Sequence, residues 1–484
     1  MAESLKSKTI RGTIWSAFQK FGVMGLSFVA NMILARKLSP DDFGCIAMLA
    51  IFLVISDTFM DGGLGSALIQ KKNLSDRDSS TVFYFNLSLS TILYGVLYFS
   101  APLISDFYRL DILTPVLRVQ GLVLIINSFG VVQTSLLRKE MLFRKLAVAN
   151  IVASIGSLAV AIALAFSGFG VWALVYQQIA LSGIRVLCLW LLSIWRPRAG
   201  FSTESFRQLF GFGSFIFLSN MVNNLGNNIQ GVIIGRAFNA GVLGYYSQAK
   251  KLEEMASTTF SNIIDQVTFP ALAAKQHDLA AMAAVMRKLV KMIAFVSFPL
   301  MIILAITGEQ IITICYGDQW QESVPYFRIL CFAGIAICLQ GVNFYAVAAI
   351  GKSKSILTWT LIKRTVGIAL MLIGLHWGIY GLLFGVVAAS YFILFANAIQ
   401  VQQYIRYTLW RQFKDVMPTI GGCLVSAAAS IGVAFVLRQS FYVTALIEIV
   451  IFSSVYLLYS YLIKAESLVD IKDIAVSYIG KLKK

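Results

Sequence analysis

Charged residues are scarce in this 484-residue chain, where Asp, Glu, Lys and Arg together make up only 13% of the sequence. A soluble globular protein carries roughly 25% charged residues. Hydrophobic residues make up 58% of the chain, in runs long enough to cross a bilayer. This composition excludes a large soluble domain and predicts an all-α polytopic membrane protein.

Histidine and cysteine are also rare, with two and six residues. His277 and His376 lie far apart, at the ends of predicted helices. The cysteines lie mostly within apolar runs and show no CxxC spacing, so we interpret them as small buried hydrophobic side chains. These features argue against a catalytic constellation, and we expect no enzymatic activity, no metal site and no bound cofactor.

Acidic residues are outnumbered, and the net charge is +17. In a soluble protein that excess suggests nucleic acid, but the chain has no nucleic-acid-binding motif, and we predict no such partner. In a membrane protein, basic residues instead mark the cytoplasmic loops. With the N-terminus placed inside, most of the 40 basic residues fall in predicted inside segments, so both termini are predicted to be cytoplasmic.

About fourteen segments are apolar and long enough to span a bilayer as helices. They cover approximately residues 12–36, 42–68, 80–105, 114–136, 147–167, 170–194, 209–236, 241–269, 288–307, 323–350, 355–375, 379–403, 417–437 and 441–463.

The chain also repeats itself at an offset of 200 residues. ARKLSPDDFGCIA, which starts at Ala35, aligns with GRAFNAGVLGYYS, which starts at Gly235. Both segments lie at the predicted outer turn between the first two helices of a six-helix unit, so the repeat is parallel, and such halves commonly flank a central substrate site. The predicted domains are an N-terminal lobe (1–194), a cytoplasmic linker (195–208), a C-terminal lobe (209–403), two further helices (417–463) and an amphipathic cytoplasmic tail (464–484).

One apolar stretch, 211–254, carries five asparagines on a single helical face. Unpaired amides are costly in hydrocarbon, so this face must meet water, other helices or a polar cargo. Asparagine can also simply tie helices together. Our hypothesis is that the face lines a polar cavity. The residues are Asn220, Asn223, Asn224, Asn227 and Asn228.

Basic residues also occur inside predicted spans, where they should point inward and be paired or hydrated. Lys20 lies in the first helix, and Lys250 and Lys251 lie in the eighth. Lys363 and Arg364 lie in the eleventh, and because adjacent residues cannot point the same way, one of each pair can pack while the other faces a cavity. We predict that Lys20, Lys250, Lys251 and Arg364 contact an anionic, hydroxyl-rich cargo.

Two acidic residues, Asp57 and Asp61, are spaced i, i+4 on the second helix. They either form interhelical salt bridges or carry a coupling ion, Na⁺ or H⁺. The repeat aligns them with Ser257 and Ser261, so the charges are not duplicated with the scaffold. That asymmetry favours a role in cargo chemistry.

Three motifs carry a resemblance to a known family: LARKLSPDDFG from Leu34, DGGLGSALIQ from Asp61, and IIGRAFNAGVLGYYSQAKKL from Ile233. The chain resembles the polysaccharide-transport branch of the MOP (multidrug/oligosaccharidyl-lipid/polysaccharide) superfamily, and more narrowly the Wzx-type flippases of the colanic-acid exporter and teichuronic-acid export group. The resemblance implies a MATE-like fold of two six-helix lobes plus two helices in the bacterial inner membrane. It also implies export of an undecaprenyl-pyrophosphate-linked oligosaccharide for capsule, exopolysaccharide or O-antigen synthesis, with a polysaccharide polymerase and a chain-length regulator as candidate partners.

Such a flippase is expected to work by alternating access, with the pyrophosphate at Lys20 and Lys250 or Lys251 and the glycan along the asparagine face. One alternative is a drug or cation antiporter of the MATE branch, whose cavity should be acidic. A second is a membrane-embedded polysaccharide enzyme, which the two separated histidines and the parallel repeat do not support.

Overall fold

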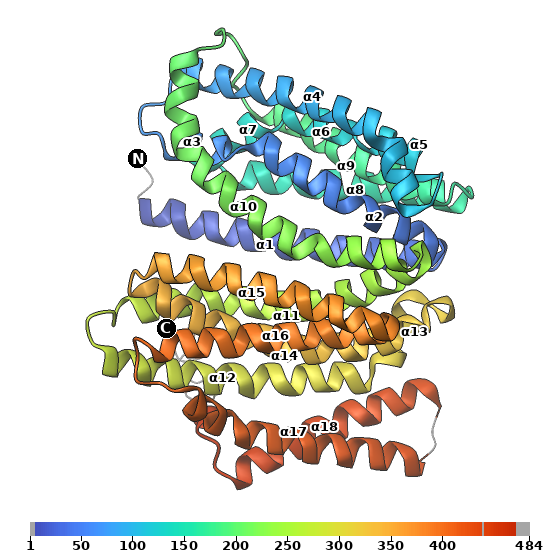
Figure 1. The fold of residues 1–484 in the computed structure, drawn as a ribbon, viewed down its shortest axis with the longest axis vertical. Helices are drawn as coiled ribbons and strands as arrows, with labels where there is room; N and C mark the ends of the chain where they lie inside the picture. Colours follow the sequence, from blue (N-terminus) through green and yellow to red (C-terminus); the bar gives the residue numbers. More distant parts are fainter. Residues whose placement is uncertain (1–4, 438–439, 471–484) are drawn as a thin grey trace. The chain divides into compact units, whose positions relative to one another are not determined.

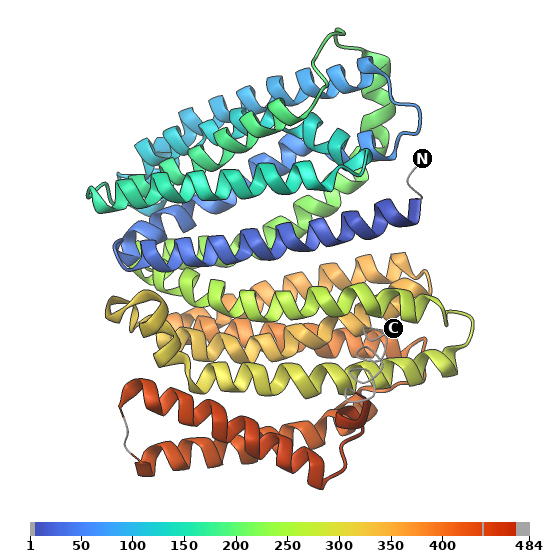
Figure 2. The same ribbon diagram turned by 180° about the vertical axis from the view of Figure 1, so that it is seen from behind.

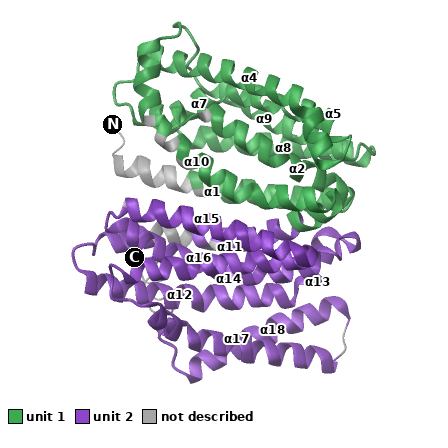
Figure 3. Ribbon diagram, in the orientation of Figure 1, with its two compact units in different colours: residues 1–247 green, residues 248–484 purple. Residues whose placement is uncertain are grey.

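The computed structural model describes residues 5–437 and 440–470, and within those ranges the chain forms helices and turns with no strand (Figure 1). The backbone forms two compact units, residues 1–247 (unit 1) and 248–484 (unit 2), shown separately coloured in Figure 3. The boundary falls inside helix α11 (Ala240–Ala273).

Unit 1 contains ten helices in its described part and the start of α11 (Figure 2). Helix α8 packs against α1 and α9, and α10 packs against α2, α3 and α4. Leu68, Val82 and Val132 form part of its buried core. The helices are α1 (Leu5–Ala35), α2 (Pro40–Asp61), α3 (Leu64–Gln70), α4 (Asp76–Tyr108), α5 (Leu113–Gln120), α6 (Leu122–Ser128), α7 (Val131–Lys139), α8 (Phe143–Phe166), α9 (Val171–Leu192) and α10 (Thr203–Ala237).

Unit 2 continues α11 and adds seven α-helices within the described ranges. Helix α14 packs against α12 and α16, α15 packs on α16, and α17 packs against α18 and α12. Met301, Val342 and Phe452 belong to its core. The helices are α12 (Leu279–Ile306), α13 (Gly308–Tyr316), α14 (Ser323–Ala349), α15 (Ser353–Gly374), α16 (Gly378–Gln402), α17 (Leu409–Leu437) and α18 (Phe441–Leu462).

Eleven stretches of the described residues are helical, long and apolar enough to cross a membrane, and one of them, Lys354–Gln402, contains both α15 and α16. Helices α10 and α11 have 35 and 34 residues but are not among the eleven. The protein is therefore a multi-pass membrane protein, and the long helices match the predicted segments to within several residues at most ends.

Two local features of the structure differ from the sequence prediction. The predicted single span at 114–136 is divided into α5, α6 and α7, with breaks at Gly121 and Gly130. Helix α10, which the repeat assigns to the second lobe, packs here against helices of unit 1. The predicted tail lies outside the described residues from position 471 onward, so the amphipathic tail stays a prediction.

The two repeated turns begin their helices with side-chain caps. Ser39 and Asp42 form a reciprocal capping box at the start of α2, with Asp42 N donating to Ser39 Oγ at 3.2 Å and Ser39 N donating to Asp42 Oδ2 at 2.9 Å. At the aligned position before α11, Asn239 Oδ1 accepts a hydrogen bond from Val242 N at 2.8 Å. The repeated motif therefore encodes a helix start.

Candidate functional site

Unit 1 contains two half-open cavities of about 280 and 360 Å³, and Asn127 and Arg185 line both of them. Residues of α1, α6, α8 and α9 line the first cavity. The second is lined mainly by residues of α2, α3, α7 and α9. The two shared residues, Asn127 and Arg185, are polar side chains inside an otherwise apolar bundle.

Charges of both signs line the larger cavity: Arg138 and Arg185 are basic, and Asp57 is acidic. Arg185 is the single charged residue of α9. Within the described part of the chain its guanidinium makes no hydrogen bond, although it interacts electrostatically with Arg138 and Asp57. The cavity therefore has an excess of positive charge and offers guanidinium donors to an anion.

Amides and hydroxyls line the smaller cavity. Asn150 donates through Nδ2 to Leu146 O at 2.8 Å, and the hydroxyl of Ser154 donates to Asn150 O at 2.8 Å. These side chains have used a donor on their own helix, so the oxygens that remain can accept hydrogen bonds from cargo hydroxyls. Together the two cavities suit a ligand that is both anionic and rich in hydroxyl groups.

The asparagine face of α10 has two different local roles. Asn224 donates through Nδ2 to Thr58 Oγ1 of α2 at 2.8 Å, which ties the two helices together. Asn228 donates to the backbone of its own helix, at Asn224 O, at 2.9 Å. For Asn224 the structure thus supplies the helix-tying contact that the sequence left open as the alternative.

The other predicted cargo residues of unit 1 are exposed. Exposure is what a cavity-facing or water-facing side chain requires, but it does not itself define a cavity, so their role stays a prediction. These residues are Lys20 on α1 and Asn220, Asn223 and Asn227 on α10.

Two predicted cargo residues at the start of unit 2 differ in their surroundings. Lys250 Nζ lies 3.6 Å from Glu254 Oε1, one helical turn away on α11. Lys251 is exposed. A partly exposed i, i+4 ion pair of this kind is worth only about 0.3–0.5 kcal/mol. The role of Lys250 and Lys251 in cargo binding stays a prediction.

The adjacent basic residues on α15 separate into a packed one and a half-exposed one. Lys363 is buried, and its Nζ donates to Asn397 Oδ1 of α16 at 2.6 Å. Arg364 is only half-buried. Lys363 is thus the packed residue of the pair, and the role of Arg364 in cargo binding stays a prediction.

Asp57 lines the larger cavity of unit 1, close to the two arginines. That position is compatible with a charge partner or an ion carrier, so both interpretations remain. The side chain of Asp61 lies outside the described residues.

Sequence reasoning missed Arg185, Arg138 and Asn127 as cavity residues. Arg185 had a usable signal, because an arginine inside an apolar span is costly unless it faces a polar interior. Asn127 had a weaker signal, a single amide inside the predicted span 114–136, which can equally tie helices together.

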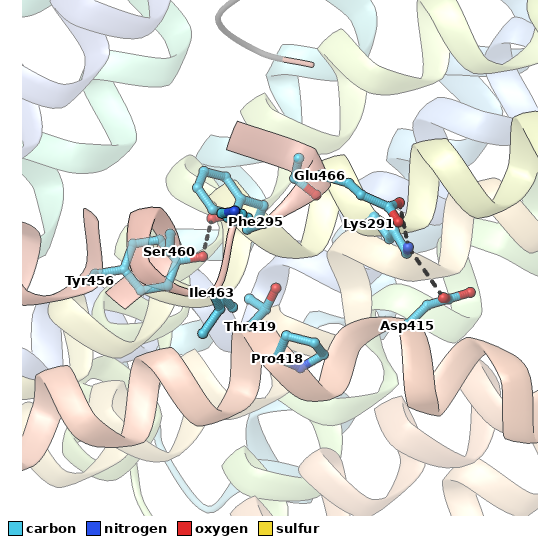
Figure 4. Close-up of a pocket in the computed structure, with 12 residues that line it drawn as sticks. Lys291, Phe295, Asp415, Pro418, Thr419, Tyr456, Ser460, Ile463 and Glu466 are labelled. Atoms are coloured by element: carbon cyan, nitrogen blue, oxygen red, sulfur yellow. Dashed lines mark hydrogen bonds and ion pairs between the residues drawn. The ribbon is translucent and has the colours of Figure 1, made fainter. Parts of the chain in front are cut away.

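A third cavity, of about 180 Å³, lies in unit 2 and is shown in Figure 4. In its wall Lys291 Nζ lies 2.7 Å from Glu466 Oε2 and 3.5 Å from Asp415 Oδ1, and Tyr456 donates to Phe295 O at 2.9 Å. Glu466 follows the last span, and the hydrogen bond from Lys291 holds its pKa below the usual value. Because these charges pair with one another, we interpret this cavity as a structural junction of α12, α17 and the segment after α18.

A match to a known protein family shows which family the chain belongs to. Residues 33–325 match the family described as polysaccharide biosynthesis protein. The chain belongs to this family. Its similar proteins include the teichuronic acid biosynthesis protein TuaB of Bacillus subtilis, which is 28% identical over 361 residues that cover 74% of each chain.

A second relative is the lipopolysaccharide biosynthesis protein WzxC of Escherichia coli, 25% identical, with 69% of this chain and 68% of WzxC aligned. Among solved structures, the lipid II flippase MurJ in an inward closed conformation aligns with a TM-score of 0.76, 15% identity, 94% of this chain and 98% of MurJ. At that identity the likeness shows a shared fold. The shared fold and the eleven candidate spans confirm the predicted class, an all-α polytopic membrane protein.

Proposed function

We propose that this family member is a flippase that moves a lipid-linked, anionic oligosaccharide from the inner to the outer leaflet of the bacterial inner membrane. The family description and the names of TuaB and WzxC support a role in surface polysaccharide synthesis. The MurJ-like fold supports transport of a lipid-linked cargo rather than an enzymatic reaction. The lipid we assign is undecaprenyl pyrophosphate.

The observation that carries the proposal is the arginine-bearing cavity of unit 1. Arg138 and Arg185 share its wall with a single carboxylate, that of Asp57. Inside an apolar bundle that excess of positive charge favours phosphate or an acidic sugar. An antiporter of cationic drugs needs the opposite sign in its cavity.

In this mechanism the cargo lipid keeps its tail in the bilayer while the protein shields its polar part. Arg138 and Arg185 contact the anionic part of the cargo in this proposal, and the exposed asparagines of α10 contact the glycan. The basic residues predicted from the sequence, Lys20, Lys250, Lys251 and Arg364, are further proposed contacts for the pyrophosphate. An inside-negative potential favours outward movement of an anion by about 2.3 kcal/mol per charge for each 100 mV. Both termini are cytoplasmic in this proposal, and a polymerase and a chain-length regulator receive the exported unit.

The test uses purified protein in liposomes that contain a fluorescent undecaprenyl-pyrophosphate oligosaccharide. Arg185→Ala should slow flipping by about tenfold or more, because a charge-assisted contact to the anion is lost. Arg77→Ala, which removes an exposed arginine of the same unit, is the matched control and should keep the wild-type rate. Equal rates for both variants would remove Arg185 from the site, and export of a cationic dye without any flipping would overturn the function.

A further inference from the structure

A glutamate in unit 2 is buried with one oxygen unpartnered. Glu253 on α11 is only 3% exposed, and its Oε1 accepts no hydrogen bond from the residues that the structure describes. A buried carboxylate without a partner is strongly unfavourable in an apolar bundle. Burial without a partner for this oxygen therefore favours the protonated, neutral form of the carboxyl group.

Several hydroxyl groups and one thiol lie near Glu253. Ser257 and Ser261 follow it at i+4 and i+8 on the same face of α11, and Ser297 comes from α12. The hydroxyl oxygens of all three are buried without a hydrogen-bond partner among the described residues. Cys338 of α14 lies beside Ser261 and Ser297, and its thiol donates weakly to Ser257 O at 3.9 Å.

Helix α14 is shaped to accept the carboxyl group. A Cβ at Gly334 would lie 2.5 Å from Glu253 Oε1 and 2.9 Å from Met301 Sδ. Both distances are too short for a carbon atom, so a larger residue at 334 would displace the ends of the Glu253 and Met301 side chains. The carboxyl group therefore lies directly against α14 at Gly334.

The charged and titratable groups that face Glu253 would do little to stabilise a negative charge on its carboxyl group. On α11 the neighbours are Lys250 and Glu254, which pair with each other at 3.6 Å. On α14 they are the thiols of Cys331 and Cys338. From α12 the facing residues are Ser297 and Met301, which carry no charge.

We propose that Glu253 is the proton carrier that couples flipping to a proton gradient. Its O–H bond breaks when a conformational change brings the carboxyl group into contact with water on the cytoplasmic side. The proton leaves to that water, and the carboxylate takes up a proton from the opposite side before it is buried again. One proton moves inward for each cargo that moves outward. This inference rests on the proposed transport function and adds its energy source.

The experiment measures the distribution of the lipid-linked oligosaccharide between leaflets in liposomes, with the membrane potential clamped. If one proton is exchanged per cargo, a gradient of one pH unit shifts that distribution by about tenfold toward the acidic side. Glu253→Gln keeps the shape of the side chain and should still flip, with a distribution that no longer responds to the pH gradient. Glu448→Gln, the same change at another buried glutamate of unit 2, should respond as the wild type does.

A second measurement needs no variant. Cargo is added to weakly buffered wild-type protein in detergent that contains a pH-sensitive dye. The protein should release about one proton per molecule into the solution. An unaltered gradient response in Glu253→Gln, a response of the wild type to Na⁺ instead of protons, or no proton change on cargo addition would overturn the proposal. Wild-type protein that does not flip the cargo at all would instead contradict the transport function.

Discussion

Gly44 and Gly244, which the internal repeat aligns, each pack against the first residue of the other's helix. A Cβ at Gly44 would overlap the carbonyl group of Ala240, where α11 begins, and a Cβ at Gly244 would overlap that of Pro40, where α2 begins. The relationship is reciprocal, as a pseudo-twofold repeat requires. The repeated motif is therefore explained by close packing of two helix starts, and the functional residues must be sought elsewhere.

Substitution of either glycine should destabilise unit 1. We expect Gly44→Ala or Gly244→Ala to cost about 1–3 kcal/mol, because the new methyl group forces the backbones apart. Thermal unfolding of the purified protein in detergent measures the effect. Gly25→Ala is the control, since a Cβ there meets no atom within 4 Å, and it should leave the unfolding temperature unchanged or higher. Equal effects at Gly25 and Gly44 would rule out the packing explanation.

The two kinds of asparagine on α10 should respond differently to alanine. Asn224→Ala should lower stability by about 0.6–1.7 kcal/mol, because it removes the interhelical hydrogen bond to Thr58. Combination with Thr58→Val should add little, which a double-mutant cycle measures. Asn223→Ala, at an exposed position, should leave stability unchanged and slow flipping. If Asn223→Ala flips at the wild-type rate, Asn223 does not contact cargo.

The adjacent residues Lys363 and Arg364 should separate stability from transport. Lys363→Met should lower the unfolding temperature, because Asn397 loses its buried partner. Arg364→Met should leave the unfolding temperature nearly unchanged and reduce the flipping rate. The reverse assignment of the two phenotypes would show that Lys363, not Arg364, meets the cargo.

The junction after α18 should weaken in acid. The pKa of Glu466 is depressed by Lys291, so this contact contributes its full stability above the unfolded pKa and loses it as the pH falls through the folded pKa. Limited proteolysis of the C-terminal segment should therefore become faster below about pH 4.5, the usual value for a glutamate. Glu466→Gln should abolish this pH dependence, and a variant that keeps it would place the titrating group elsewhere. Because the pair is exposed, the effect is expected to be small.

Much of the fold could be predicted because lipid imposes a simple rule. Each span must be a long apolar helix, so the segments at 147–167 and 323–350 correspond closely to α8 and α14. The division of α5, α6 and α7 could not be predicted, because Gly121 and Gly130 are tolerated inside apolar runs. The repeat indicated a pair of related turns, but only the coordinates show that they pack against each other.

The candidate site was harder to predict because polar residues in spans acquire their roles from distant partners. In the sequence Asn224 does not differ from the neighbouring asparagines. In the structure it donates a hydrogen bond to Thr58, which is far away in the sequence. Arg185 is a single charge in a span that has no other charged residue, so the sequence does not show which partners it meets. Glu253 is a charged residue inside the predicted span 241–269, but its burial against Gly334 depends on how α11 and α14 pack, which the sequence does not show.

The most direct test of the central claim is flipping of an undecaprenyl-pyrophosphate oligosaccharide by the purified wild-type protein in liposomes. A membrane-impermeant glycosidase added outside should reach only about half of a fluorescent cargo in empty liposomes, since lipids distribute over both leaflets. With the protein present, nearly all of the cargo should become accessible, at a rate that Arg185→Ala slows and Arg77→Ala does not. Accessibility that stays at the empty-liposome level with folded wild-type protein would contradict the account.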